Sequence, residues 1–196
     1  MWTYRRNAVS DVQTQPPLYS VTEERIQAVP KPFFLGLSDK ANGQAQEYAR
    51  QVLRRVQKQK LDTEAVVDFT ADGHARYTIG ASGKMQASSP ELSVPYYSLH
   101  NHASNDILSS EDVRRLIRRT NMKGVGAVGH AGALYTCEKV YGYDQERANR
   151  WLQSLKKKYP LYKSDTDDLE KALAQRIAFA EELRRDGAKY GLVFSG

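Results

Sequence analysis

The segment "YSLHNHASNDILSSED", residues 97–112, holds the side chains of this chain that are best suited to bind a metal ion. His100 and His102 stand one residue apart at the end of an apolar run, and Asp106 and Asp112 follow within ten residues. Imidazole nitrogens and carboxylate oxygens are common zinc ligands, and catalytic zinc takes three protein ligands and keeps one position for water. The segment therefore predicts a zinc site made of both histidines and one aspartate.

The period of a β-strand decides which of these side chains can share an ion. Alternate side chains of a strand point to the same face, so His100 and His102 share a face while Asn101 points the other way. Asp106 belongs to the loop that follows, and Asp112 to the first turn of a helix expected over residues 109–121. A strand-to-helix reversal can return Asp112 to the histidines, so we expect His100, His102 and Asp112 to be the metal ligands.

Helix capping is a structural explanation for the end of the same segment. In "SSED", Ser109 can accept a hydrogen bond from the amide three residues on, and Glu111 or Asp112 complements the helix N-terminus. Capping alone accounts for the aspartate but not for two histidines at strand spacing. The histidine pair therefore favours the metal site.

Hydrophobic periodicity predicts an α+β fold. Apolar residues at three-and-four spacing predict a helix over residues 44–58, and "TADG" between two β-rich runs predicts a hairpin in which Gly73 takes a positive φ. The other elements that we expect are strands over 63–69, 74–80, 94–102, 124–130 and 133–142, and helices over 109–121, 144–158 and 166–186.

Composition excludes several classes of site. Cys137 is the only cysteine of the 196 residues, so neither an internal disulfide nor a four-cysteine zinc site can form, and we expect Cys137 to be a small core residue. The net charge of +6 favours phosphates, anionic membranes or acidic proteins as partners. No segment approaches the roughly 18 apolar residues of a membrane span. We therefore expect a cytoplasmic protein without a membrane segment.

His100, His102, Ser109 and Asp112 resemble the signature of the JAMM (MPN+, JAB-domain) zinc metalloproteases, which is His-x-His, seven residues, Ser, two residues and Asp. The segment is also similar to the corresponding one in RadC-like proteins and phage-associated relatives. Two departures stand out: Ala103 replaces the usual proline, and six residues rather than seven separate His102 from Ser109. The resemblance covers residues 44–142.

This resemblance implies a fold and a division of the chain. The fold is a JAMM/MPN-like (cytidine-deaminase-like) core with a mixed sheet flanked by helices, followed by C-terminal helices. Residues 1–43 are expected to form a proline-bearing N-terminal arm, residues 44–142 the metal-binding core, and residues 143–196 a helical extension packed on the core.

The resemblance also implies an activity, that of a zinc-dependent hydrolase, a metalloprotease or isopeptidase, that cleaves a peptide or isopeptide bond through a metal-activated water. Glu64 is the best candidate for the glutamate that deprotonates the water, with Glu47 as its rival, and Ser109 is expected to donate to the oxyanion. His74 and His130 are weaker candidates for a functional role. The expected cofactor is Zn²⁺, and the expected partner is a protein or peptide substrate.

A second function stays open from the sequence. The chain can instead be a catalytically weak or inactive JAMM-fold binding or scaffold protein, phage- or defence-associated, whose basic helices contact an acidic partner or nucleic acid. Ala103, the shortened loop and the positive charge motivate this alternative. Salt-sensitive nucleic-acid binding that survives removal of metal would distinguish it from the hydrolase.

Overall fold

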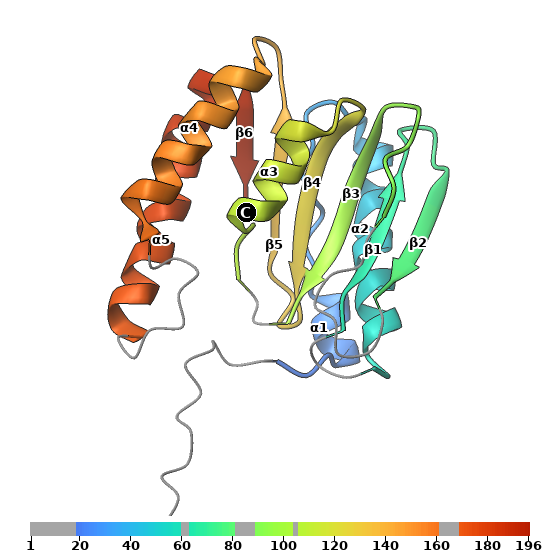
Figure 1. Ribbon diagram of the computed structural model, residues 1–196. Coiled ribbons are helices and arrows are strands. Elements are labelled where there is room, and N and C mark those ends of the chain that lie inside the picture. Colours follow the sequence, from blue (N-terminus) through green and yellow to red (C-terminus); the bar gives the residue numbers. More distant parts are fainter. Residues whose placement is uncertain (1–18, 60–62, 81–88, 104–105, 161–168) are drawn as a thin grey trace, which may run out of the picture.

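In the computed structural model, which describes residues 19–59, 63–80, 89–103, 106–160 and 169–196, a six-stranded mixed sheet lies between two layers of helices (Figure 1). The strand order is β2-β1-β3-β4-β5-β6. The strands are β1 (Ala65–Phe69), β2 (Ala75–Ile79), β3 (Tyr96–His102), β4 (Met122–Gly129), β5 (Leu134–Lys139) and β6 (Leu192–Ser195). The α-helices of the described residues are α1 (Glu23–Gln27), α2 (Asp39–Val56), α3 (Ser110–Arg118), α4 (Gln145–Lys158) and α5 (Leu169–Asp186).

The sheet is mixed because one of its strand pairs is parallel. β3 pairs with β4 in parallel, and α3 is the crossover between them. The pairs β1–β2, β1–β3, β4–β5 and β5–β6 are antiparallel. The expected α+β class, with a mixed sheet flanked by helices, is therefore confirmed.

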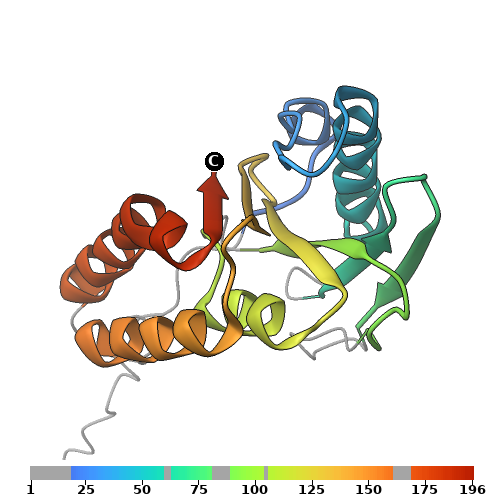
Figure 2. The same cartoon turned by 90° about the horizontal axis from the view of Figure 1, so that it is seen from above.

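Two hydrophobic cores form, one on each face of the sheet (Figure 2). α1 and α2 cover one face, where Ala49 and Val52 of α2 pack in one cluster with Val67 and Phe69 of β1. α3, α4 and α5 cover the other face, and Cys137 is buried there as the sequence predicts. β3 passes between the two cores, so its alternate side chains enter different environments.

The α2 helix begins five residues before the predicted start at residue 44. Ser38 is its N-cap, with the side chain accepting a hydrogen bond from the Ala41 amide at 3.2 Å. This cap satisfies one of the amides that a helix N-terminus leaves open, so the helix can include Asp39 and the residues after it. The predicted hairpin is confirmed, and Gly73 has a φ of 96°.

Two parts of the sheet and its cover were not predicted. β6 extends the sheet beyond β5, and its four residues are too short for a recognisable period. Ile26 of α1 and Phe34 are fully buried in the core beneath α2. Of the expected N-terminal arm, residues 1–18 lie outside the described residues, as do residues 166–168 of the last predicted helix. None of the described helices is long and apolar enough to cross a lipid bilayer.

Candidate metal centre

β3 carries His100 and His102 on the face of the sheet that α3 covers. The strand lies in the middle of the sheet, with Val66 of β1 opposite His100 on one side and Ala127 of β4 beside it on the other. The apolar residues of β3 hold it between the two cores, so that His100 is 1% exposed. His102 is the last residue of the strand and is partly exposed. The pair is therefore fixed by buried backbone but open at one end.

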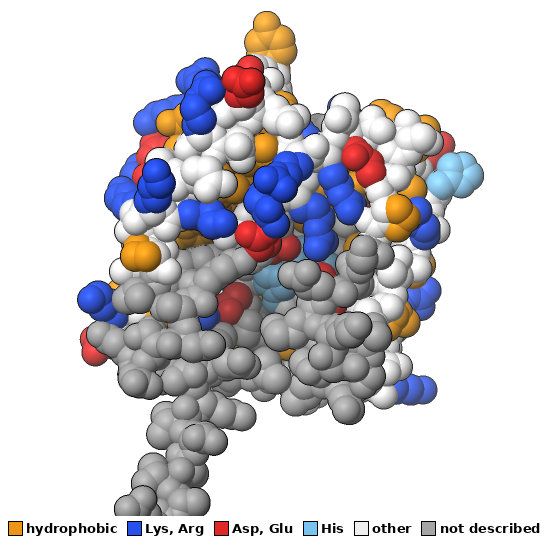
Figure 3. Space-filling view, viewed as in Figure 1, with side chains coloured by type: hydrophobic (Ala, Val, Ile, Leu, Met, Phe, Trp, Pro, Cys, Tyr) orange, Lys and Arg blue, Asp and Glu red, His pale blue; other side chains and the backbone are white. Residues whose placement is uncertain are grey.

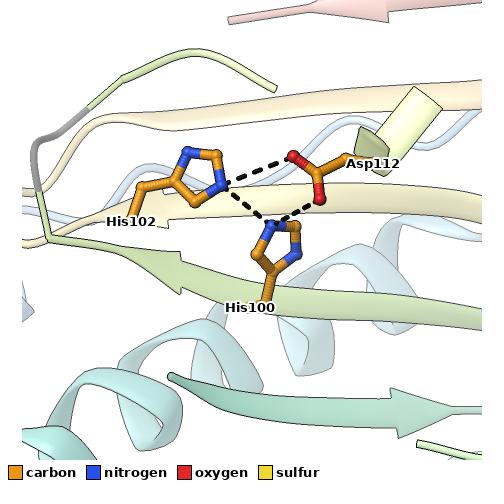
Figure 4. Close-up of side chains that lie close together, drawn as sticks. All are labelled: His100, His102 and Asp112. Atoms are coloured by element: carbon orange, nitrogen blue, oxygen red, sulfur yellow. Dashed lines mark hydrogen bonds and ion pairs between the residues drawn. The ribbon is translucent and has the colours of Figure 1, made fainter. Parts of the chain in front are cut away.

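The first turn of α3 brings Asp112 back over the two histidines (Figure 4). The two Nε2 atoms of His100 and His102 are 3.0 Å apart. Asp112 places Oδ1 at 3.2 Å from Nε2 of His100 and Oδ2 at 3.4 Å from Nε2 of His102. One ligand atom from each of the three residues lies within 4.8 Å of the others. The structure therefore brings the three predicted ligands into one cluster.

Asp112 also caps the helix that carries it. Its Oδ2 accepts a hydrogen bond from the Ser109 amide at 2.7 Å, and the Ser109 hydroxyl oxygen accepts one from the Asp112 amide at 3.2 Å. The capping explanation and the metal explanation therefore hold together. The cap fixes the rotamer of the carboxylate, so Asp112 faces the histidines without further adjustment.

A backbone carbonyl orients the ring of His102. Its Nδ1 lies 3.0 Å from the carbonyl oxygen of Asp106, and because a carbonyl only accepts, Nδ1 carries the proton. Nε2 is then the lone-pair nitrogen that faces the cluster, which is the usual arrangement of a metal-binding histidine. Nδ1 of His100 is buried and has no hydrogen-bond partner among the described residues.

Mutual electrostatics shifts two of the three groups. Burial disfavours the charged form of His102, but the hydrogen bond and charge of Asp112 outweigh burial and raise the pKa of His102. Burial likewise acts against the ionised form of Asp112, yet both histidines hold the pKa of this carboxyl well below its usual range. The cluster thus keeps an anionic carboxylate and attracts positive charge.

The donor set and its spacing fit a zinc ion. A tetrahedral zinc with bonds of about 2.0–2.1 Å separates neighbouring ligand atoms by about 3.4 Å. The two histidine nitrogens are 3.0 Å apart, and each lies close to a different oxygen of Asp112, at 3.2 and 3.4 Å; with one atom from each residue, the three ligand atoms lie within 4.8 Å of one another. Two imidazoles and one carboxylate also match the three-ligand sets of catalytic zinc, which leave a fourth position open. The donor types therefore suit a zinc ion, and the three side chains already face one point.

Glu64 lies next to this cluster by strand register. The Gly80 amide donates to the Glu64 carbonyl at 2.7 Å, so the β1–β2 ladder continues to Glu64. The β1–β3 ladder ends at the Val66–His100 pair, two residues after Glu64, and beyond it the Ala65 amide and the Thr63 carbonyl bond to the Asn101 side chain. Val66 pairs with His100, and alternate side chains of a strand share a face, so the strand period puts Glu64 on the histidine face, where it is 7% exposed. Its catalytic role stays a prediction.

A buried network behind the histidines had no strong sequence signal. Asn101 Oδ1 accepts from the Ala65 amide at 2.7 Å, and its Nδ2 donates to the Thr63 carbonyl at 3.0 Å. Nδ2 also lies 2.9 Å from Nε2 of His130, whose Nδ1 donates to the Tyr19 carbonyl at 2.7 Å. Burial lowers the pKa of His130, which keeps the neutral ring that this pattern requires. Asn101 thus forms hydrogen bonds with the backbone on both sides of Glu64.

The remaining candidates lie away from the cluster. The His74 side chain is 88% exposed and stands 3.8 Å from Asp72 in the hairpin. Glu47 accepts a hydrogen bond from Arg54 at 2.8 Å on the outer face of α2. His130 lies on the opposite face of the sheet from the histidine pair, where it supports Asn101 rather than an ion. The cluster of His100, His102 and Asp112 is the metal-ligand group that the described residues form.

Comparisons of the chain with protein-family models, with curated proteins and with solved structures found no match.

Proposed function

We propose that this protein is a zinc-dependent hydrolase of the JAMM type, which cleaves peptide or isopeptide bonds. The observation that carries the proposal is the convergence of His100, His102 and Asp112 on one point, with a capping box that holds the carboxylate. The placement of Glu64 on the same face and of Ser109 beside Asp112 supports it. The motif that these residues form is the JAMM signature with a loop one residue shorter.

His100, His102 and Asp112 would hold the zinc ion. When bound, zinc supplies a Lewis acid that polarises a carbonyl and lowers the pKa of a water molecule from about 15.7 to near 7. Two neutral imidazoles and one carboxylate leave the ion a net positive charge, which this chemistry needs.

Glu64 is the proposed general base. From the histidine face its carboxylate accepts the proton of the attacking water and returns it to the leaving amine, so one group serves both transfers. Such a positioned base contributes about 10²- to 10⁴-fold to the rate. Asn101 bonds to the backbone of the residues on either side of Glu64, and these bonds hold the Glu64 backbone against β3.

Ser109 has a donor available for the developing oxyanion. Its hydroxyl oxygen accepts from the Asp112 amide, and this bond leaves the hydroxyl hydrogen for another acceptor. Because Ser109 is partly exposed beside the cluster, a substrate carbonyl can receive that hydrogen. A donor aimed at the oxyanion stabilises the transition state more than the ground state.

The primary test measures metal. The purified protein, reconstituted with zinc and freed of excess, should hold one zinc per chain by elemental analysis. His102→Gln and Asp112→Asn should lose it. His74→Gln removes an exposed histidine far from the cluster and should keep it. A wild-type protein that holds no zinc after reconstitution contradicts the proposal.

A second test separates metal binding from hydrolysis. Glu64→Gln should retain one zinc and lose peptide or isopeptide cleavage by about 10²-fold or more, measured on a mixed peptide library by mass spectrometry. Glu47→Gln, the matched change on α2, should cleave like the wild type. Equal cleavage by the Glu64→Gln protein would remove this residue from the mechanism.

A further inference from the structure

The α3 helix has two long edges, and they face different neighbours. Each helical residue advances about 100°, so Arg115 lies about 60° from Asp112 around the axis while Arg118 lies about 120° away, toward solvent. Val113, Leu116 and Ile117 fill the buried side. Arg115 therefore lies one turn beyond Asp112, between the edge that carries Asp112 and the solvent side of the helix.

This edge of α3 is turned toward the β1 side of the sheet. Arg119, just after the helix, donates to the Tyr96 hydroxyl at 3.0 Å and to the carbonyl of Ser89. The Ser89 hydroxyl in turn donates to Asp68 of β1. α4 approaches the exposed side of α3, where Lys156 lies 3.5 Å from Glu111, about 40° around the axis from Arg115. Arg115 thus stands between the metal cluster and Arg119, on the side from which β1 presents Glu64.

Arg115 differs from its arginine neighbours because its guanidinium has no hydrogen-bond or ion-pair partner among the described residues. Arg114 forms an ion pair with Glu111, and Arg119 is held by Tyr96 and Ser89. Within the described part of the chain, no hydrogen bond or ion pair engages the guanidinium of Arg115, which is half-buried. In Figure 3, Lys and Arg side chains gather over α3 and α4, directly above a hollow in which histidine and acidic side chains are visible.

We propose that Arg115 binds a carboxylate of the substrate close to the scissile bond. This inference rests on the proposed function and names its substrate class. A guanidinium offers a fork of N–H donors that matches a carboxylate bidentately. Three helical residues separate Arg115 from Asp112, an axial distance of about 4.5 Å. An extended peptide advances about 3.3 Å per residue, so the carboxylate belongs to a residue one or two positions from the cleaved bond.

Two sources can supply this carboxylate: an Asp or Glu side chain, or the C-terminus of a short peptide. Nucleic acid fits less well, because phosphate backbones bind through several adjacent cations and bases stack on exposed aromatic rings. On α3 the charge of Arg114 is already matched by Glu111, and the helix carries no aromatic side chain. A single free guanidinium beside a metal centre suits one carboxylate.

The test uses zinc-loaded protein and acetylated peptides that differ only in having Glu, Gln or Lys at the two positions on each side of a common amide bond. Each peptide is made with a free and with an amidated C-terminus, which separates the two sources. We expect kcat/KM to favour the Glu or free-acid peptide over its neutral counterpart by about tenfold to a hundredfold, mainly through KM.

Variants on one helix supply the control. Arg115→Gln should abolish the preference, and Arg115→Glu should turn it toward the Lys peptide. Arg118→Gln removes the same charge from the solvent side of α3 and should keep the wild-type preference. An unchanged preference in the Arg115→Gln protein overturns the inference.

A binding measurement keeps this inference separate from the proposed function. Fluorescent Glu-containing and Gln-containing peptides are titrated into zinc-loaded Glu64→Gln protein, with a single-stranded oligonucleotide as the third probe. One zinc per chain and cleavage without acidic preference would overturn the carboxylate site and leave the hydrolase standing. If the protein holds no zinc but binds the Glu peptide through Arg115, the carboxylate site stands and the hydrolase proposal is overturned. Tighter binding of the oligonucleotide than of the Glu peptide also overturns the inference.

Discussion

Asn101, the residue between the two histidines, connects the metal cluster to Glu64. Its amide is fully used: Oδ1 accepts from the Ala65 amide, and Nδ2 serves the Thr63 carbonyl and His130. One buried side chain therefore brackets the backbone of Glu64 from the strand that carries His100 and His102. Glu64 and the two histidines are thus positioned by the same three-residue stretch of β3.

Replacing Asn101 by Ala should separate positioning from metal binding. The loss of three hydrogen bonds in a buried site should lower the free energy of unfolding by about 1–3 kcal/mol. We expect zinc to stay bound and kcat for peptide cleavage to fall about tenfold, with KM nearly unchanged. Val56→Ala in α2 destabilises the fold away from the cluster and should leave kcat intact. Equal effects of both variants on kcat would assign Asn101 a purely structural role.

The raised pKa of His102 should make zinc binding depend on pH near neutrality. In the metal-free protein, Asp112 favours the protonated ring, so zinc must displace a proton. Apparent zinc affinity should therefore fall with decreasing pH, beginning above the ordinary histidine pKa of 6.5, by up to tenfold per pH unit for each displaced proton. Asp112 stays ionised throughout, since its pKa is lowered.

Chelator competition between pH 6 and 8 measures this dependence, and a flat profile would contradict it. The same linkage acts on the metal-free fold with the opposite sign. The His102–Asp112 pair stabilises that fold below about pH 6.5, and this contribution is lost as the pH rises through the raised pKa of His102.

At the residue scale, the local spacing predicted the candidate ligands but did not predict the contacts of Asn101 that hold the neighbouring backbone. The strand period put His100 and His102 on one face, and the capping signature placed Asp112 in a first helical turn; both follow from backbone geometry over a few residues. The contacts of Asn101 could not be predicted in this way. They depend on β1 and on His130, which pairing of distant segments brings together.

The crossover from β3 through α3 to β4 is the element that makes the cluster. In parallel pairing, His102 lies beside Gly129 at the carboxyl end of both strands, and the N-terminus of α3 stands above that edge. Crossover helices of parallel pairs commonly begin at such edges, where ligands bind. The capping box then fixes which residue of the first turn faces the strand.

Ser109→Ala should test whether the cap also serves the metal. Loss of an N-cap side chain lowers the free energy of unfolding by about 0.5–2 kcal/mol. Ser38→Ala removes the equivalent cap of α2 and should cost a similar amount, since its side chain also accepts from the amide three residues on. We expect zinc affinity to fall in the Ser109 variant alone, because the first helical turn that carries Asp112 loses its side-chain cap there, although the Ser109 backbone amide can still donate to the Asp112 carboxylate. Denaturant unfolding and zinc titration of both variants provide the measurement.

The elements themselves were predictable where a period ran long enough. Helices α2, α3 and α4 and the five strands from β1 to β5 appear within a few residues of their expected places. β6 and α1 did not, because four or five residues carry no distinguishable pattern. Their positions depend on contacts with β5 and α2 that are distant in sequence.

At the scale of the whole molecule, the last helix reaches the loop that orients a ligand. Arg176 of α5 lies 3.2 Å from the Asp106 carboxylate, and the Asp106 carbonyl accepts the Nδ1 proton of His102. The resemblance to JAMM proteins does not extend to this helix, which was expected only to pack on the core. Through Arg176 and Asp106, this helix also contacts the loop that orients the ring of His102.

Arg176→Gln should therefore loosen the centre with little effect on stability. The pair is partly exposed, so we expect the free energy of unfolding to change by less than about 1 kcal/mol. Zinc should dissociate severalfold faster, a smaller effect than the 10–100-fold typical of losing a direct partner of a ligand. Arg150→Gln breaks an exposed pair on α4 and should not alter dissociation. Stopped-flow transfer of zinc to a chelator compares the two.

The three ligands lie within thirteen consecutive residues, from His100 to Asp112. Closing so short a loop costs little chain entropy, whereas the pairing of β1 with β3 joins residues that are 28 to 34 positions apart. An ion can accordingly be captured by a nascent β3–α3 unit before the rest of the sheet assembles. We expect zinc to speed refolding as well as to slow unfolding, so that the bound ion acts as a folding nucleus for the chain.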